Sequence, residues 1–263
     1  MTVIQALLYY IPTSLLGFLL VALFCAFAAS GLFVFRKLIP VHRSRLHNDI
    51  AGFIFSTMGV MYAVLVAFMV IVSWQSFDKT SVNLEKEANY YADLYRDSAA
   101  LSADAQTKIR AALTAYISSS VDDEWPLLAK GGSSEKTNKL FLKVWDVYTG
   151  YSPKTEMQKV FFSESVQKLN DASELRRERI LDARTGLHPV LWFILILSGA
   201  LTVLFTFFFG TENRIEQLCM TCLLSSLIAM VLFTIMVFDY PFTGGVSVPS
   251  SVFKQLLGSL GTI

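Results

Sequence analysis

The sequence has few of the residues on which metal sites, redox centres and disulfide frameworks depend. It holds three cysteines and three histidines in 263 residues. Cys25, Cys219 and Cys222 all lie in apolar segments, so they predict no disulfide framework. The CxxC spacing of the last two lacks the further Cys or His partners of a metal site, and each histidine lies near a segment end without a partner. We therefore expect no metal and no cofactor.

Catalytic motifs are also missing from the sequence. It contains no glycine-rich phosphate loop, no nucleophile elbow and no paired carboxylates within an apolar segment, so it offers no catalytic constellation. Coupled transporters commonly place a carboxylate or histidine within the membrane, whereas Asp49 and Asp239 here lie only at segment ends. These absences argue against an enzyme and against a coupled carrier.

Charge is scarce as well, because only 16% of the residues are charged, while 54% are hydrophobic and the mean hydropathy is +0.50. Aspartate, glutamate, lysine and arginine are absent from four long apolar segments: residues 12–35, 50–74, 190–209 and 218–238. About 20 apolar residues in a helix span a bilayer core. The sequence therefore predicts a multipass membrane protein with four transmembrane helices and the lipid bilayer as a partner.

Most of the charge lies between the second and third apolar segments. Apolar residues recur there at helical spacing, and the breaks "DDEWPLLAKGGSSE" and "GYSPK" divide the region into two helical hairpins or about four helices. We expect an all-α chain with a soluble helical bundle inserted between transmembrane helices 2 and 3. The predicted divisions are 1–74 (transmembrane helices 1 and 2 with a basic connecting loop), 75–187 (bundle), 188–239 (transmembrane helices 3 and 4) and 240–263 (an interfacial tail).

The predicted bundle has a balanced charge, which argues against a nucleic-acid surface. Its one basic cluster, "ELRRERILDAR", precedes the third apolar segment and contains Arg176, Arg177 and Arg179. This cluster could lie at a pore mouth, line a vestibule or contact lipid headgroups. Alternatively, it is a solvated helix face with Glu and Arg at helical spacing. No turn signal separates Trp74 from Glu85, so we expect the second transmembrane helix to continue into the bundle.

The second apolar segment begins with a polar entrance and carries small residues along one face. Asn48 or Asp49 is suited to cap the helix N-terminus, next to His47. A stripe of small residues, which allows helices to approach closely in lipid, is formed by Gly52, Ser56, Gly59 and Ala63. The polar candidates for a pore and its mouth are His47, Asn48, Asp49, Ser56, Thr57 and Tyr62. The hydroxyl of Tyr62 should face protein or water rather than lipid.

Five ordered motifs resemble those of the bacterial bestrophin-like membrane family. They are "HNDIAGFIFSTMGVMYAVLVAFMVIVSW", "EKEANYYADLYR", "DDEWPLLAKGG", "LHPVLWFIL" and "FDYPFTGGVSV", and they span residues 47 to 248. By motif, the resemblance marks His47, Asn48, Gly52, Tyr62, Trp74, Glu87, Ala88, Leu94, Tyr95, Glu124, Trp125, Pro126, Asp239, Pro241, Phe242 and Gly244.

The resemblance implies an oligomeric channel, because true bestrophins are oligomeric anion channels with four membrane segments and a large helical soluble region. The chain has no acidic calcium-clasp run, so the sign of the permeant ion stays open. We expect a homo-oligomer that passes ions passively along a pore lined by transmembrane helix 2. The alternative is a membrane sensor or scaffold whose bundle binds a ligand or protein partner, although no output domain follows the fourth segment.

Two signals conflict on sidedness in the expected location, the bacterial inner membrane. The loop "RKLIPVHRSRLH" is basic, so the positive-inside rule places it in the cytoplasm and the bundle outside, in the periplasm or extracellular space. Against this, the arginines of "ELRRERILDAR" lie near the third segment, and true bestrophins keep their large region in the cytosol. The short basic loop favours an outside bundle.

Overall fold

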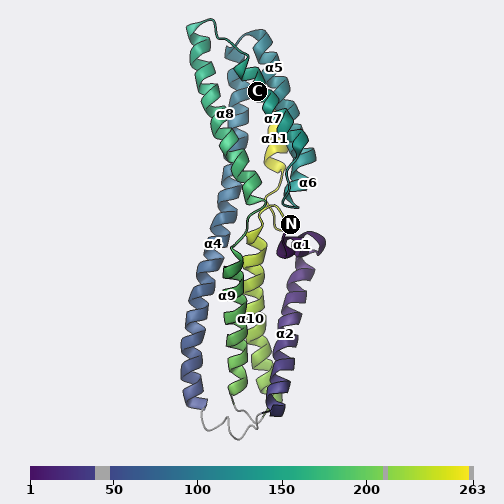
Figure 1. Cartoon of the computed structure of the whole chain (residues 1–263), viewed down its shortest axis with the longest axis vertical. Coiled ribbons are helices and arrows are strands. Elements are labelled where there is room, and N and C mark those ends of the chain that lie inside the picture. Colours follow the sequence, from purple (N-terminus) through teal and green to yellow (C-terminus); the bar gives the residue numbers. More distant parts are fainter. Residues whose placement is uncertain (39–47, 210–212, 261–263) are drawn as a thin grey trace. The chain divides into compact units, whose positions relative to one another are not determined.

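The computed structural model describes residues 1–38, 48–209 and 213–260. Every regular element in these ranges is a helix (Figure 1). The chain divides into two compact units. The membrane unit consists of Tyr10–Ser76 and Gly186–Asp239, and the bundle unit consists of Met1–Tyr9, Phe77–Thr185 and Tyr240–Ile263.

The membrane unit contains four helices that are long and apolar enough to cross a bilayer. They are α2 (Thr13–Leu38), the first part of α4 (Asn48–Asp97), α9 (Pro189–Phe205) and α10 (Arg214–Asp239). The four predicted apolar segments therefore correspond to helices. A single 3₁₀ turn, η3 (Thr206–Phe208), follows α9.

Close packing in the membrane unit occurs at glycines that the sequence did not single out. A Cβ atom built on Gly31 of α2 would lie 2.8 Å from the ring of Phe207, and one on Gly17 would lie 3.1 Å from the ring of Phe233 on α10. The most extensive helix pairing of this unit is between α2 and α10. These glycines allow helices to approach where lipid supplies no hydrophobic driving force between them.

Helix α4 is continuous, as the sequence predicted, and runs for 50 residues without interruption. No glycine or proline occurs between Gly59 and Asp97, so nothing in this stretch favours a kink. One stripe of buried residues follows its length at spacings of three, four or seven: Val66, Met69, Ser73, Thr80, Leu84, Glu87, Tyr91 and Leu94. This spacing is that of a helix with one buried face.

The bundle unit packs the second part of α4 with α5 (Ala103–Ser119), α7 (Glu135–Thr149) and α8 (Glu156–Asp182). Ser102, Ser134 and Thr155 cap the N-termini of the last three helices, each accepting a backbone hydrogen bond two or three residues into the helix. Short elements complete the unit: α1 (Val3–Tyr10), η1 (Ser98–Ala100), η2 (Ser120–Glu124), α6 (Trp125–Leu128) and α11 (Ser251–Ser259).

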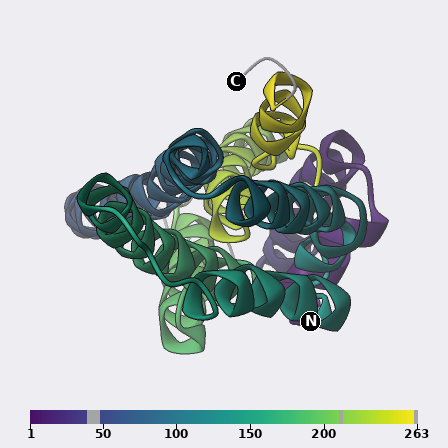
Figure 2. The same ribbon diagram turned by 90° about the horizontal axis from the view of Figure 1, so that it is seen from above.

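The C-terminal segment differs from the interfacial tail that the sequence suggested for residues 240–263. Phe242, Val248 and Phe253 are buried in the core of the bundle unit. Helix α11 lies beside α5, as the end-on view also shows (Figure 2). The N-terminus joins the same unit, because Gln5 is buried and donates to the carbonyl of Ala183 at 3.1 Å. In the tail, Phe253, Leu256 and Leu260 recur every three or four positions, and this apolar face of the helix is buried in the bundle core.

Candidate functional site: a buried ion-pair network and the exposed face of α4

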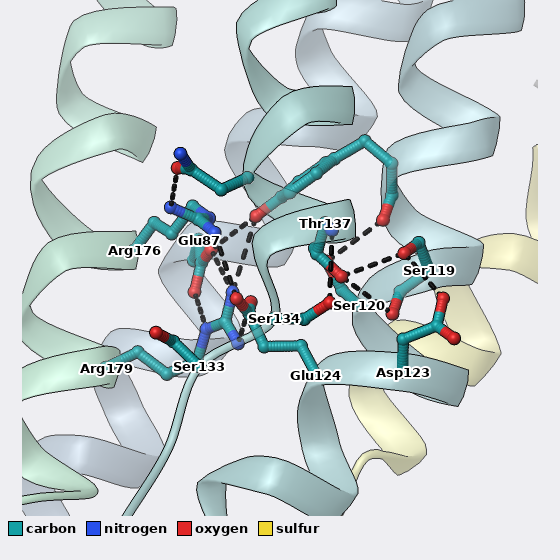
Figure 3. A network of polar contacts seen from close by, with 12 residues as sticks. Glu87, Ser119, Ser120, Asp123, Glu124, Ser133, Ser134, Thr137, Arg176 and Arg179 are labelled. Atoms are coloured by element: carbon teal, nitrogen blue, oxygen red, sulfur yellow. Dashed lines mark hydrogen bonds and ion pairs between the residues drawn. The ribbon is translucent and has the colours of Figure 1, made fainter.

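Four charged side chains meet in the interior of the bundle unit (Figure 3). Arg179 donates from Nε to Glu87 at 2.8 Å and from Nη1 to Glu124 at 3.2 Å. Arg176 donates from Nη2 to the other oxygen of Glu124 at 2.9 Å. None of the four side chains is more than 6% exposed. Two carboxylates and two guanidinium groups therefore balance one another out of contact with water.

Tyrosines extend the network on the α4 side. The Tyr116 hydroxyl accepts from Arg179 Nη2 at 3.3 Å and donates to Glu87 at 3.4 Å, and Tyr91 donates to Glu87 at 3.2 Å. Burial, reinforced by the nearby Glu87 carboxylate, raises the pKa of Tyr116 to about 12. Although burial alone would lower the pKa of Arg179, the combined effect of Glu87, Tyr116 and Glu124 outweighs it, so this pKa lies above its ordinary value. At neutral pH the tyrosine is therefore protonated and the arginine charged.

Aromatic rings close the network from the other side. The Arg179 guanidinium carbon lies 5.4 Å from the ring centroids of both Trp125 and Phe253, and that of Arg176 lies 5.0 Å from Phe141. Desolvated cations over aromatic faces gain electrostatic attraction. The indole of Trp125 also donates to the carbonyl of Val248 at 3.3 Å, which ties the network to the C-terminal segment.

The local sequence explains how each charge reaches the interior. Glu87 lies on the buried stripe of α4 between Leu84 and Tyr91. Glu124 ends the π-helical turn η2, an irregularity that shifts the following side chains around the helix axis. Arg176 and Arg179 lie three residues apart, on one face of α8.

This outcome corrects both interpretations of "ELRRERILDAR". Arg176 and Arg179 form neither a basic ring at a mouth nor a solvated face, because they are buried and paired with acids. Arg177 and Arg184 of the same stretch are exposed. The signal for this pairing was present, since Glu87 and Glu124 lie on faces whose other residues are apolar. Which arginine each acid binds could not be deduced, because the residues are far apart in the chain.

A second polar cluster lies next to the first (Figure 3). The hydroxyls of Ser119 and Thr137 are 2.8 Å apart, and Ser119 donates to Asp123 at 2.8 Å. Lys136 forms an ion pair with the same carboxylate at 2.7 Å, and the Ser119 and Lys136 hydrogen bonds hold the pKa of Asp123 below its ordinary value. This cluster joins α5 to the start of α7 and stabilises the frame around Glu124.

The candidate pore residues of α4 fall into two groups. Ser56 and Thr57 are exposed, and their hydroxyls donate to the carbonyls of Gly52 and Phe53 within the helix. Tyr62 instead faces the interior of the membrane unit, as expected of its hydroxyl, because a Cβ on Gly199 of α9 would lie 2.8 Å from that oxygen. Tyr62 is therefore removed from the exposed candidates.

The small stripe lies open among the described residues. A Cβ built on Gly52 or Gly59 would meet no heavy atom within 4 Å, and Ser56 and Ala63 are exposed. At the start of α4, Asp49 is exposed and Asn48 is half-buried, whereas His47 lies outside the described residues. The membrane half of α4 thus presents a small, weakly polar face that the described helices of the chain do not cover.

The remaining motif residues have structural surroundings. Asp239 accepts from the backbone of Leu187 at 2.6 Å and from the indole of Trp192 at 3.2 Å. Gly244 has a φ of 90°, a conformation that favours glycine. The others lie as follows: Trp74 is exposed, Tyr95 is half-buried under Arg110, Pro126 is at the start of α6, and Pro241 and Phe242 are buried.

Within the described residues, no group of three His, Cys, Asp or Glu side chains could hold a metal ion. The buried network also contains no cysteine, serine or histidine nucleophile next to a base. Its carboxylates are neutralised by arginines, so it is suited to hold helices in register rather than to perform catalysis.

Comparison with known proteins gives one family. The model of the bestrophin-like domain matches residues 22–253. No curated protein matches the chain. Among solved structures, a bacterial bestrophin homologue from Klebsiella pneumoniae is similar at 14% identity, with a TM-score of 0.68 over 92% of this chain and 96% of that one. A single-substitution variant of the bestrophin homologue from Klebsiella pneumoniae has 14% identity and a TM-score of 0.69 over 93% of this chain and 97% of that one. A structure described as a membrane protein variant has 14% identity and a TM-score of 0.70 over 92% of this chain and 96% of that one.

Proposed function

Because the chain belongs to the bestrophin-like family, we propose that it assembles into a homo-oligomeric membrane channel that passes ions passively along a path lined by α4. The observation that carries this proposal is the uncovered face of α4 in the membrane unit. Its small and hydroxyl-bearing residues Ser56, Thr57 and Ala63 are exposed, while its opposite face packs on α9. True bestrophins, which this chain resembles in architecture, are oligomeric channels.

Assembly through α4 gives the open glycines a partner. Small residues stabilise helix association in lipid only when another backbone approaches them, and Gly52 and Gly59 lack such a neighbour in one chain. Subunits related by an axis would place α4 of each copy around a shared path. We expect native mass spectrometry in detergent to show an oligomer, and Gly59→Leu to dissociate it without preventing membrane insertion. Only monomer in the wild type would contradict assembly.

Passive conduction follows from the charge distribution. The membrane half of α4 contains no Asp, Glu, His, Lys or Arg side chain beyond Asp49 at its start, so it lacks the groups that coupled carriers commonly use. A path without fixed charges can be gated by an apolar constriction, with selectivity set by rings of residues at its mouths. With Arg176 and Arg179 buried, the basic cluster is smaller than the sequence suggested, and a ring of exposed Asp49 side chains at the other end of the path favours cations.

Reversal potentials test this proposal. In planar bilayers under a salt gradient, the wild type should show unitary currents with a cation-selective reversal potential, and Asp49→Asn should move that potential toward zero. Asp104→Asn, on the exposed surface of the bundle unit, is the matched control and should leave it unchanged. Proteoliposomes of verified oligomeric state that pass no ions across voltage, pH and membrane tension would refute the channel.

Ligand sensing by the bundle is the second candidate, favoured by a groove between α7 and α8 with a volume of about 460 Å³. Its lining includes Trp145, Asn170 and Arg176, and the buried Nε of Arg176 has no hydrogen-bond acceptor among the described residues. Thermal unfolding in a panel of small carboxylates tests it. A stabilisation that Asn170→Ala removes, in protein that passes no ions, would favour the sensor over the channel.

We also propose that the bundle unit lies outside the cytoplasm in a bacterial inner membrane, on the strength of the basic residues that follow α2. Ser133 is exposed and suited to a reporter. In a background without the three native cysteines, Ser133→Cys should react with an impermeant maleimide on whole cells. Protection from labelling until the cells are lysed would reverse the proposed topology.

A further inference from the structure

A cavity of about 370 Å³ opens between α2 and α10, where α2 ends and α10 begins. Its walls are apolar and its rim is basic. The apolar lining consists of Ala29, Leu32, Phe33 and Leu218, and the polar lining of Arg36, Lys37, Arg214 and Gln217. The volume lies within the range of small-ligand sites. All eight residues belong to the membrane unit.

The charged side chains in the described lining of this cavity are all cationic. Arg36, Lys37 and Arg214 line it, and its described lining contains no carboxylate. The two cations of α2 lie in the last turn, where the helix dipole favours them, but Arg214 begins α10, where the dipole is positive. Helix ends therefore do not account for the position of Arg214. An anion in the cavity would compensate it.

Arg36 is held in place before any ligand binds. Its Nη2 donates to Oε1 of Gln217, a residue that is only 3% exposed. Gln217 in turn donates from Nε2 to the carbonyls of Phe209 at 2.9 Å and Thr206 at 3.3 Å. A buried amide anchored to two backbone carbonyls thus fixes the guanidinium at the rim, which lowers the entropic cost of binding.

The position along the helices identifies the source of the anion. The apolar span of α2 ends immediately before Arg36, and the apolar span of α10 starts four residues after Arg214. The basic rim therefore lies at the level of the lipid headgroups, and the apolar walls lie at the level of the acyl chains. Basic pockets between transmembrane helices are suited to anionic headgroups.

We propose that this cavity is a binding site for an anionic phospholipid. The phosphate would lie among Arg36, Lys37 and Arg214, and an acyl chain would follow the wall formed by Ala29 and Phe33. The site is independent of conduction, so it can be tested whether or not the protein is a channel.

The test is a lipid titration of the full chain purified in detergent, followed by thermal unfolding. Phosphatidylglycerol should raise the unfolding midpoint at lower concentration than phosphatidylcholine with the same acyl chains. Removing a positive charge near a membrane surface weakens binding about fivefold, so the double variant Arg36→Gln with Arg214→Gln should lose about 25-fold in apparent affinity for phosphatidylglycerol. Lys143→Gln, an exposed lysine on α7, is the matched control and should bind as the wild type does.

Two further measurements distinguish a lipid from a soluble anion and test whether the apolar lining of the cavity contacts an acyl chain. Inorganic phosphate should not reproduce the stabilisation, and Ala29→Phe, which keeps all three cations, should weaken binding by narrowing the acyl groove. Unchanged affinity in the double variant or in Ala29→Phe would overturn the proposal. An equal response of the wild type to both lipids, or to inorganic phosphate alone, would also overturn it.

Discussion

The two parts of α4 solve the same packing problem with different chemistry. In the membrane unit its buried stripe consists of residues such as Val66 and Met69, and helices come close at glycines. In the bundle unit the same stripe carries Glu87, which is fully buried and bound to Arg179. Water around the bundle supplies a hydrophobic driving force that can offset the burial of charge, whereas lipid supplies none between helices. Specific contacts therefore come from ion pairs in one unit and from close backbone approach in the other.

Breaking the ion-pair network should have the largest effect. Arg179→Met leaves Glu87 buried without its main partner, and removing one member of a buried pair costs about 3–5 kcal/mol in the free energy of unfolding. Arg177→Met, at the exposed neighbouring position, should change it by less than about 0.5 kcal/mol. Denaturant unfolding measures both. Equal stability of the two variants would show that the network is not a stabilising contact.

The glycine comparison should give a smaller effect that differs in sign between sites. Gly31→Ala places a methyl group 2.8 Å from the buried ring of Phe207 and should cost about 1–3 kcal/mol. In dissociated monomer, Gly52→Ala meets no heavy atom of the described residues within 4 Å and should stabilise α4 by up to about 1 kcal/mol through helix propensity. Thermal unfolding of the two variants as monomers distinguishes them. Destabilisation of the monomer by Gly52→Ala would contradict an open face at this position.

Replacing Tyr116 should reduce the pH dependence of the bundle unit's free energy of unfolding by up to about 1.4 kcal/mol per pH unit between pH 10 and 12. The pKa of Tyr116 is raised to about 12 by burial, against about 10 in an unfolded chain. The folded state therefore keeps its proton while the unfolded state loses it, so stability falls as the pH rises from 10 toward 12. Each pH unit in that window contributes about 1.4 kcal/mol.

Tyr116→Phe should remove this contribution, and the variant should lose less stability than the wild type between pH 10 and 11. Thermal unfolding at the two pH values measures the difference. Tyr90→Phe, a half-buried tyrosine of the same unit, controls for the loss of a hydroxyl. An identical loss of stability in wild type and Tyr116→Phe would exclude Tyr116 as the titrating group.

Helix capping should give the smallest effect. The Ser134 hydroxyl accepts from the backbone of Thr137 at 3.2 Å at the start of α7, so Ser134→Ala should cost about 1 kcal/mol. In the membrane unit, His188 Nδ1 accepts from Val190 at a longer 3.4 Å at the start of α9. His188→Ala should therefore cost less than Ser134→Ala in the same unfolding assay. The reverse order would show that the cap matters more in the membrane unit.

The sequence predicted the membrane helices and the continuity of α4 because these depend on local patterns. Long uncharged runs identify spans, and the lack of glycine and proline after Gly59 identifies a continuous helix.

The candidate site was less accessible from the sequence, since pairing is a property of tertiary structure. Nothing in "ELRRERILDAR" distinguishes buried Arg176 and Arg179 from exposed Arg177. The inward direction of Tyr62 could have been deduced, because Tyr62 and Glu87 are 25 residues apart and, at about 100° per residue, lie within about 20° on the helix. The open surroundings of Gly52 and Gly59 could not have been deduced, because a sequence does not show which helix faces are packed against one another.

The unbroken length of α4 sets a fixed angle between features that lie far apart along it. Thr57 and Glu87 are 30 residues apart, which at about 100° per residue places them about 120° apart around the helix axis. Insertion of one residue after Ser76 would turn one part of the helix by about 100° against the other and displace it by about 1.5 Å. Such an insertion would change the phase between Tyr62 and Glu87, which now lie within about 20° of each other around the helix axis. An insertion of seven residues, which adds about 700°, would nearly keep that phase.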